Sequence, residues 1–190
     1  MSPITHFLIG WATANTAPLD RRSRALVTVA GIIPDADGLG VFPEVLTRNS
    51  SHPLPWFTEY HHILGYNIGF AIVVTIVSAL LAKTKRWKTA LLVAISFHLH
   101  LLGDVVGARG PNGYQWPVPY LLPFSHRGQW VWSGEWALNA WPNFVITGVL
   151  MMWTLWYAWY AGRSPIEIVS PKADDEFVTT LRRRFPRRAQ

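Results

Sequence analysis

The chain has 190 residues, of which 50% are hydrophobic and only 15% are charged, whereas a soluble domain usually carries about 25% charged residues. It contains no cysteine, which excludes disulfide frameworks and thiolate metal sites. The net charge of +6 would suit nucleic acid, but the apolar runs indicate that the basic residues flank membrane spans. We therefore predict a membrane protein that binds no nucleic acid.

The first two apolar segments are short. Residues 3–18 carry no charged side chain apart from His6, and no basic residue precedes them, so we predict a retained helix and not a cleaved signal peptide. Residues 25–34 are too short to span a membrane alone. We expect the two segments to pack as a helical hairpin against the longer ones.

Three later segments are long enough to cross a membrane. Residues 62–82 contain no Asp, Glu, Lys or Arg, and at about 1.5 Å per residue they cover roughly 30 Å, one hydrocarbon core. Residues 89–106 and the Trp-rich residues 136–161, with Pro142 near their start, are the other two. Together the five segments predict an all-α, polytopic membrane domain over residues 1–161, with about five membrane-associated helices.

The basic residues predict the orientation of this domain. Fourteen of the 17 Lys and Arg lie between the two short segments, between the first two long spans, or after the last span. The positive-inside rule then places the N-terminus outside and the C-terminus inside a bacterial-type inner membrane. Residues 162–190 are expected to be a basic cytoplasmic tail with a short helix at 174–185. The tail either binds anionic lipid headgroups or is a partly disordered anchor, which we favour.

With this topology, imidazole and carboxylate side chains collect at the extracytoplasmic face. They come from four separate segments: His6, Asp35, Asp37, His61, His62, His100 and Asp104. Imidazole nitrogens and carboxylates without sulfur suit zinc, manganese or iron. We therefore predict a site for one to three divalent metal ions, with zinc as the first candidate.

The pair in the second long span is the best anchor of this site. His100 and Asp104 are four residues apart, so on a helix they share one face. An ionisable pair inside an apolar span is costly and indicates function, although a structural hydrogen bond between helices is the alternative. His98 lies about 200° around the helix from His100 and is better explained as a packed histidine or a supporting donor.

Each of the remaining candidate ligands is, taken alone, weaker evidence for a metal site. Asp35 and Asp37 follow Pro34, which ends the second segment, and one carboxylate can bridge two ions, although such turns are also common in loops. His61 and His62 are about 100° apart on a helix, so both can be ligands only where the helix frays, and His62 is the better candidate.

A loop at 106–134, rich in Pro, Gly and aromatic residues, follows the second long span. It either lies across the membrane surface and walls a pocket, or forms an aromatic belt without a ligand. In the first case aromatic side chains lie at headgroup level and an arginine meets a phosphate. The candidate substrate-binding residues are Arg109, Trp116, Ser125 and Arg127.

The order of these motifs resembles the YdjM/YbcI-type membrane-bound metal-dependent hydrolases. The motifs are His6, residues 34–37 (PDAD), residues 61–62 (HH), residues 100–104 (HLLGD) and residues 123–125 (PFS). The same order is similar to the helical zinc-dependent phospholipase C enzymes, which implies a phosphoester substrate. The chain departs from the family in one stretch, where it has FTEYHHILGYN in place of an HRGxTHS-like sequence.

The resemblance implies a hydrolase acting on a lipid or lipid-linked phosphoester, with Asp37 as a bridging ligand or general base. Two other functions fit the residues. A metal-ion or proton transporter could use the same cluster, but the inner halves of the spans are almost wholly apolar. A non-enzymatic membrane adaptor would work through the basic tail.

Overall fold

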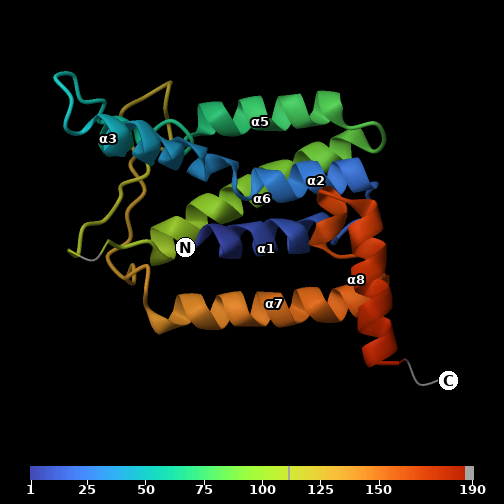
Figure 1. The fold of residues 1–190 in the computed structure, drawn as a ribbon. Coiled ribbons are helices and arrows are strands. Elements are labelled where there is room, and N and C mark those ends of the chain that lie inside the picture. The colour runs from blue at the N-terminus through green and yellow to red at the C-terminus, as the bar shows by residue number, and fades with distance from the viewer. Residues whose placement is uncertain (111, 187–190) are drawn as a thin grey trace.

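A computed structural model describes residues 1–110 and 112–186, which form eight α-helices and two 3-10 helices. Arg187 and Arg188 of the predicted basic tail lie outside the described residues. Five helices run side by side as a bundle (Figure 1): α1 (Pro3–Ala14), α2 (Arg21–Ala30), α5 (Ile68–Leu81), α6 (Arg86–Gly107) and α7 (Trp141–Ala161). The prediction of an all-helical protein is confirmed.

Side chains and glycine at the helix ends explain where the helices begin and stop. Ser2 caps α1 by accepting a hydrogen bond from the backbone N–H of Thr5, and Asp20 caps α2 in the same way. Pro142 lies in the first turn of α7, where its missing N–H costs nothing. Gly162 ends α7 in the left-handed region at φ 73°.

Only some of the bundle helices are long enough to cross a membrane. The helices α6, of 22 residues, and α7, of 21, pass on length and composition. A third candidate is α2 continued through η1 (Ile33–Gly40) and α3 (Val41–Thr47), bent by 52°. The 14 residues of α5 cover roughly 21 Å, less than a hydrocarbon core of about 30 Å. The chain therefore has two or three candidate spans.

The predicted helix over residues 62–82 begins later than expected. After α4 (Trp56–Tyr60) the chain turns, His62 adopts a left-handed φ of 64°, and α5 starts only after Asn67, whose side chain accepts from Phe70 N. The turn is pressed onto η1, since a Cβ on Gly65 would lie 2.2 Å from Pro34 O. His61 and His62 thus lie in a turn, and their predicted place at the start of a span is wrong.

Small residues bring α1, α2 and α6 into close contact. A Cβ on Gly10 of α1 would lie 2.7 Å from the carbonyl oxygen of Thr28, and one on Gly31 would lie 2.8 Å from that of His6. Such close backbone approach is typical of helix packing in membranes. The predicted hairpin of the first two segments is present, and it packs against α6.

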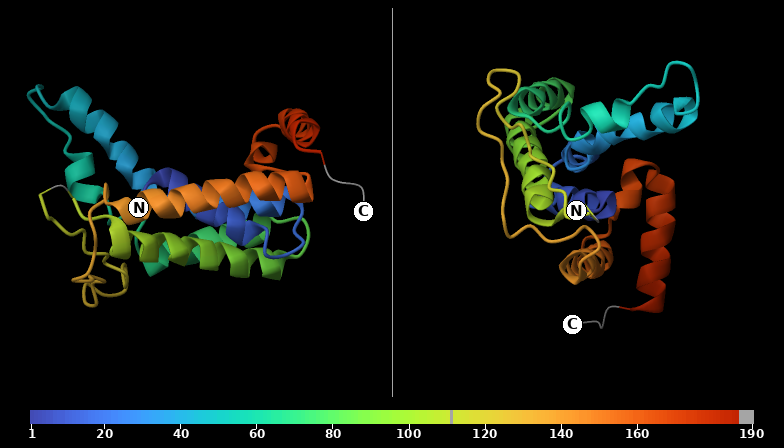
Figure 2. Two further views of the ribbon diagram at one scale, coloured as in Figure 1. Left: turned by 90° about the horizontal axis from the view of Figure 1, so that it is seen from below. Right: turned by 90° about the vertical axis from the view of Figure 1, so that its left-hand side faces the viewer.

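A second structured region closes the far end of the bundle. There α8 (Pro171–Arg184) runs across the bundle instead of along it (Figures 1 and 2), joined by η2 (Pro165–Ile168). Arg24 of α2 holds Glu167 of η2 through two buried contacts, Nε–Oε1 at 2.6 Å and Nη2–Oε2 at 2.7 Å. The helix expected at 174–185 is present and begins earlier, at Pro171.

The close approach of α1 and α2 makes a stability prediction. We expect Gly10→Ala to destabilise the protein by about 1–3 kcal/mol, because the new methyl group meets the backbone of α2. Gly148→Ala in α7 is the matched control: its Cβ meets nothing within 4 Å, so it should be neutral or stabilise by about 0.5–1 kcal/mol. Thermal unfolding in detergent, followed by tryptophan fluorescence, measures both. Equal melting temperatures for the two variants would contradict this packing.

Candidate metal centre

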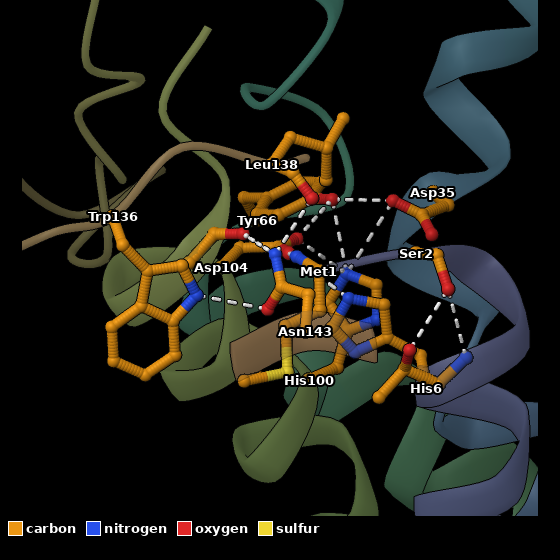
Figure 3. A network of polar contacts seen from close by, with 12 residues as sticks. Met1, Ser2, His6, Asp35, Tyr66, His100, Asp104, Trp136, Leu138 and Asn143 are labelled. Atoms are coloured by element: carbon orange, nitrogen blue, oxygen red, sulfur yellow. Dashed lines mark hydrogen bonds and ion pairs between the residues drawn. The ribbon is translucent and has the colours of Figure 1, made fainter. Parts of the chain in front are cut away.

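Two histidines and an aspartate meet at the end of the bundle opposite α8, which we call the site end. His6 is in the first turns of α1, and His100 and Asp104 are one turn apart near the end of α6. His6 Nε2 lies 2.9 Å from Asp104 Oδ1, and His100 Nε2 lies 3.2 Å from Asp104 Oδ2 (Figure 3). Donor atoms around one tetrahedral zinc ion lie roughly 3.4 Å apart, so this spacing is suitable.

The group is almost completely shielded from solvent. The exposed fractions are 0% for His6, 1% for His100 and 4% for Asp104, and one ligand atom from each lies within 4.8 Å of the other two. Buried charges of this kind are normally paired or coordinate a metal. These three residues can therefore hold a metal ion.

The hydrogen bond on the far side of His100 determines which nitrogen is free. Its Nδ1 lies 2.9 Å from the carbonyl oxygen of Gly31, the residue that ends α2. A carbonyl can only accept, so Nδ1 carries the proton, and in the neutral ring Nε2 keeps its lone pair. Histidines that bind metals usually donate their other N–H in this manner. His100 is thus held in the tautomer and direction that a metal ligand needs.

Tyr66 completes the centre, and sequence reasoning missed it. Its hydroxyl lies 2.6 Å from Asp35 Oδ1, 2.9 Å from Asp104 Oδ2 and 3.0 Å from His100 Nε2. Burial, with the Asp104 carboxylate next in effect, raises the pKa of Tyr66 well above its ordinary value, so the hydroxyl stays protonated. The expectation of a helix from residue 62 concealed it by giving Tyr66 a place on an apolar span.

Three acceptor atoms, Asp35 Oδ1, Asp104 Oδ2 and His100 Nε2, surround the Tyr66 hydroxyl, which has one proton. The single Tyr66 proton can satisfy only one of the two carboxylates, and His100 Nε2 faces the same oxygens with a lone pair. Among the described residues, Asp35 Oδ2 is buried with no hydrogen-bond partner. The amino group of Met1 contacts Asp104 Oδ1, so a positive charge already lies against this carboxylate. This donor set fits a divalent cation, which would neutralise the excess negative charge.

Asp37 and His61 form a separate pair beside the centre. Asp37 Oδ1 lies 2.9 Å from His61 Nδ1, while Oδ2 accepts from the backbone N–H of Gly65 at 3.2 Å. Because a carboxylate only accepts, His61 Nδ1 carries the proton and Nε2 is left with a lone pair. These two predicted ligands therefore bind one another and are not in the group formed by His6, His100 and Asp104.

His62 lies between the two groups. Its ring stacks on that of Tyr66 with a centroid distance of 4.1 Å, and its Nδ1 has no hydrogen-bond partner in the described part of the chain. Burial lowers the pKa of His62 to about 4, so the ring is neutral at physiological pH. A neutral imidazole nitrogen can bind a metal or accept a proton.

Two cavities open onto these residues. The first, which we call the site cavity, has a volume of about 440 Å³ and reaches Asp35 and Asp104. The second, which we call the loop cavity, has about 450 Å³ and lies under the Pro-rich loop. His61, His62 and Trp116 line both, and the Trp116 ring centroid is 5.5 Å from that of His61. Trp116 thus lines the same cavity as Asp35 and Asp104, and its role in substrate binding stays a prediction.

The other predicted substrate-binding residues are engaged elsewhere in the loop. Arg109 Nη2 donates to the carbonyl oxygen of Ser133 at 3.0 Å, and Ser125 Oγ accepts from the backbone N–H of Arg127 at 3.1 Å. None of Arg109, Ser125 and Arg127 lines either of the two cavities. The structure therefore does not bring these three to the centre.

The fold and this centre define a helical membrane protein with a buried histidine–aspartate site at one end of its bundle. The family model described as YdjM inner membrane protein matches residues 1–167, and the chain belongs to this family. The resemblance seen in the sequence is confirmed. No curated protein and no solved structure gives a match.

Removal of His100 should remove the metal. We expect His100→Ala to weaken metal binding by at least about tenfold, since even the partners of metal ligands contribute 10–100-fold. His98→Ala is the control on the same helix: His98 Nε2 instead contacts the Tyr120 hydroxyl at 2.8 Å. Metal analysis of the purified proteins measures the difference, with Asp104→Asn as a second variant of nearly unchanged shape. Equal metal content in all three would rule out this centre.

Proposed function

We propose that the protein is a membrane-embedded, metal-dependent hydrolase that acts at the extracytoplasmic membrane surface on a lipid or lipid-linked phosphoester. The observation that carries this proposal is the position of His100 Nε2, which lies 3.2 Å from Asp104 Oδ2 and 3.6 Å from Asp35 Oδ1 beside a cavity of about 440 Å³. Membership of an inner membrane protein family agrees with the membrane location.

The metal would be held by His6, His100 and Asp104, with Asp35, whose Oδ1 lies 3.6 Å from His100 Nε2, as a further ligand. Nitrogen and carboxylate ligands without sulfur make zinc the first candidate, before manganese or iron. The chemistry that such an ion supplies is acidification of a water molecule and polarisation of the scissile ester.

Proton transfer is assigned to His61. Its Nδ1 is held by Asp37 at 2.9 Å, so the free Nε2 is available as a general base or acid, and the ring lines both cavities. Asp37 then orients the imidazole and stabilises its charged form, as a buried aspartate does in hydrolytic triads. Under this proposal Asp37 supports the base and does not abstract the proton itself.

Tyr66 would keep the ligands in place. Its hydroxyl lies between Asp35 and Asp104, and its ring separates His62 from His100. A protonated phenol at this position donates one hydrogen bond and limits the approach of the two carboxylates to each other.

The distribution of positive charge supports an extracytoplasmic site. Arg21 contacts the backbone of Glu167, and Lys85 contacts that of Pro18, so both basic connections lie at the end of the bundle that carries α8. The centre lies at the opposite end. By the positive-inside rule, the end with the basic residues is cytoplasmic and the site end faces outwards.

The proposal predicts different defects for the metal-holding residues and for the pair formed by Asp37 and His61. In a hydrolysis assay on a generic phosphodiester, Asp104→Asn should lose both metal and activity. His61→Ala should keep the metal and lose about 10²–10⁴-fold in kcat, the usual contribution of a general acid or base.

The matched control for these variants is again His98→Ala, which should keep both properties. Unchanged hydrolysis in Asp104→Asn would overturn the proposal. Metal-dependent ion flux in liposomes without any hydrolysis would favour the transporter instead.

A further inference from the structure

A third hollow lies at the beginning of α5, on the outside of the bundle. It has a volume of about 560 Å³, and apart from Gly69 and Asn67 its wall is made of apolar side chains, including Ile63, Phe70 and Val73. The Asn67 amide is occupied, because Nδ2 donates to Ile63 O at 2.9 Å and Oδ1 accepts from Phe70 N. We call this hollow the α5 groove. It offers a hydrophobic ligand an apolar wall.

The α5 groove adjoins the cavities of the metal centre. Ile63 and Leu122 line both the groove and the loop cavity. The loop cavity in turn shares His61, His62 and Trp116 with the site cavity. Neighbouring hollows thus lead from the carboxylates of the centre to the apolar surface of α5.

The wall of the groove is built from the loop as well as the helix. The first N–H groups of α5 donate to loop carbonyls, Ile68 to Tyr120 at 2.7 Å and Gly69 to Leu122 at 3.1 Å. A Cβ on Gly69 would lie 2.4 Å from Pro123 Cδ, so glycine permits this close approach. The loop is therefore held against α5 by bonds that also satisfy the helix start.

The groove opens toward the region that lipid chains occupy. Ile72 and Val73 of α5 are 43% and 55% exposed, and Phe124 at the loop edge is 73% exposed. Exposed apolar side chains on a helix without charged residues indicate contact with hydrocarbon. A volume of about 560 Å³ is in the roughly 300–1,000 Å³ range of ligand sites.

We propose that the α5 groove binds one hydrocarbon chain of the substrate, which is therefore a long-chain lipid phosphoester that enters sideways from the bilayer. Its headgroup lies in the loop and site cavities, while the chain stays against α5. This inference rests on the proposed hydrolase function. It identifies the substrate class from the apolar groove adjoining the centre, which a water-soluble phosphoester would not need.

Photo-crosslinking tests the groove without requiring catalysis. The full-length protein is placed in phosphatidylglycerol vesicles containing the same lipid with a photoreactive acyl chain, and the labelled peptides are identified by mass spectrometry. We expect labelling of residues 121–124, reduced about tenfold in Val73→Trp, because the indole fills the groove. Val149→Trp on α7 is the matched control, since Val149 is 53% exposed and lies outside the groove. In this control, residues 121–124 should be labelled to the same extent as in the protein without a substitution.

Hydrolysis provides the second measurement. We expect Val73→Trp to lower kcat/KM about tenfold for long-chain phosphatidylglycerol and to leave a short-chain, water-soluble analogue unaffected. Equal labelling in Val73→Trp and Val149→Trp, or labels spread evenly over α5 and α7, would overturn the proposal that an acyl chain binds in the α5 groove.

The two proposals fail in different ways. The His100→Ala variant should keep the groove label while losing metal, because the groove contains none of the metal-holding residues. Labelling of the groove without hydrolysis of either lipid would overturn the proposed hydrolase function. Hydrolysis without labelling of the groove would overturn the proposal that the groove binds an acyl chain.

Discussion

The hydrogen bond from His100 to the carbonyl oxygen of Gly31 is the contact on which the centre depends. It joins the end of α2 to the last third of α6, the longest helix, and determines which imidazole nitrogen keeps its lone pair. The same glycine lets α1 approach, because a Cβ there would meet His6 O at 2.8 Å. Gly31 thus orients His100 through its carbonyl oxygen and, because it has no side chain, allows His6 of α1 to come close.

The burial of these side chains determines the chemistry of the centre. In water, two carboxylates, a phenol and two imidazoles would each be solvated, but here Asp104 is only 4% exposed and His6 and His100 are less so. Removing charges from water costs several kcal/mol per ion unless each is compensated. The two carboxylates share the single proton of Tyr66, and Asp35 Oδ2 has no partner among the described residues, so the site can accommodate a cation. The same shielding strengthens any polarisation of a bound substrate.

The two ends of the bundle carry different kinds of residues. Basic connections and α8 gather at one end, the candidate metal centre lies at the other, and the long apolar helices α6 and α7 run between them. The Pro-rich loop connects the centre to the exposed apolar surface of α5, since its backbone binds the start of α5 and Trp116 contacts both histidines of the turn. A substrate with a polar head and an apolar chain matches this division, because each of its parts meets a wall of its own polarity.

Much of this could be predicted from the sequence because the signals are local. Hydropathy located the five bundle helices, and the spacing of four residues put His100 and Asp104 on one face. The start of α5, the pairing of Asp37 with His61 and the position of Tyr66 required the tertiary structure. The apolar run over residues 62–82 looks like one helix, but the cap at Asn67 and the close approach of Gly65 to Pro34 delay the start of α5 to Ile68. Contacts between segments distant in sequence decide which carboxylate meets which imidazole, and no local pattern contains that information.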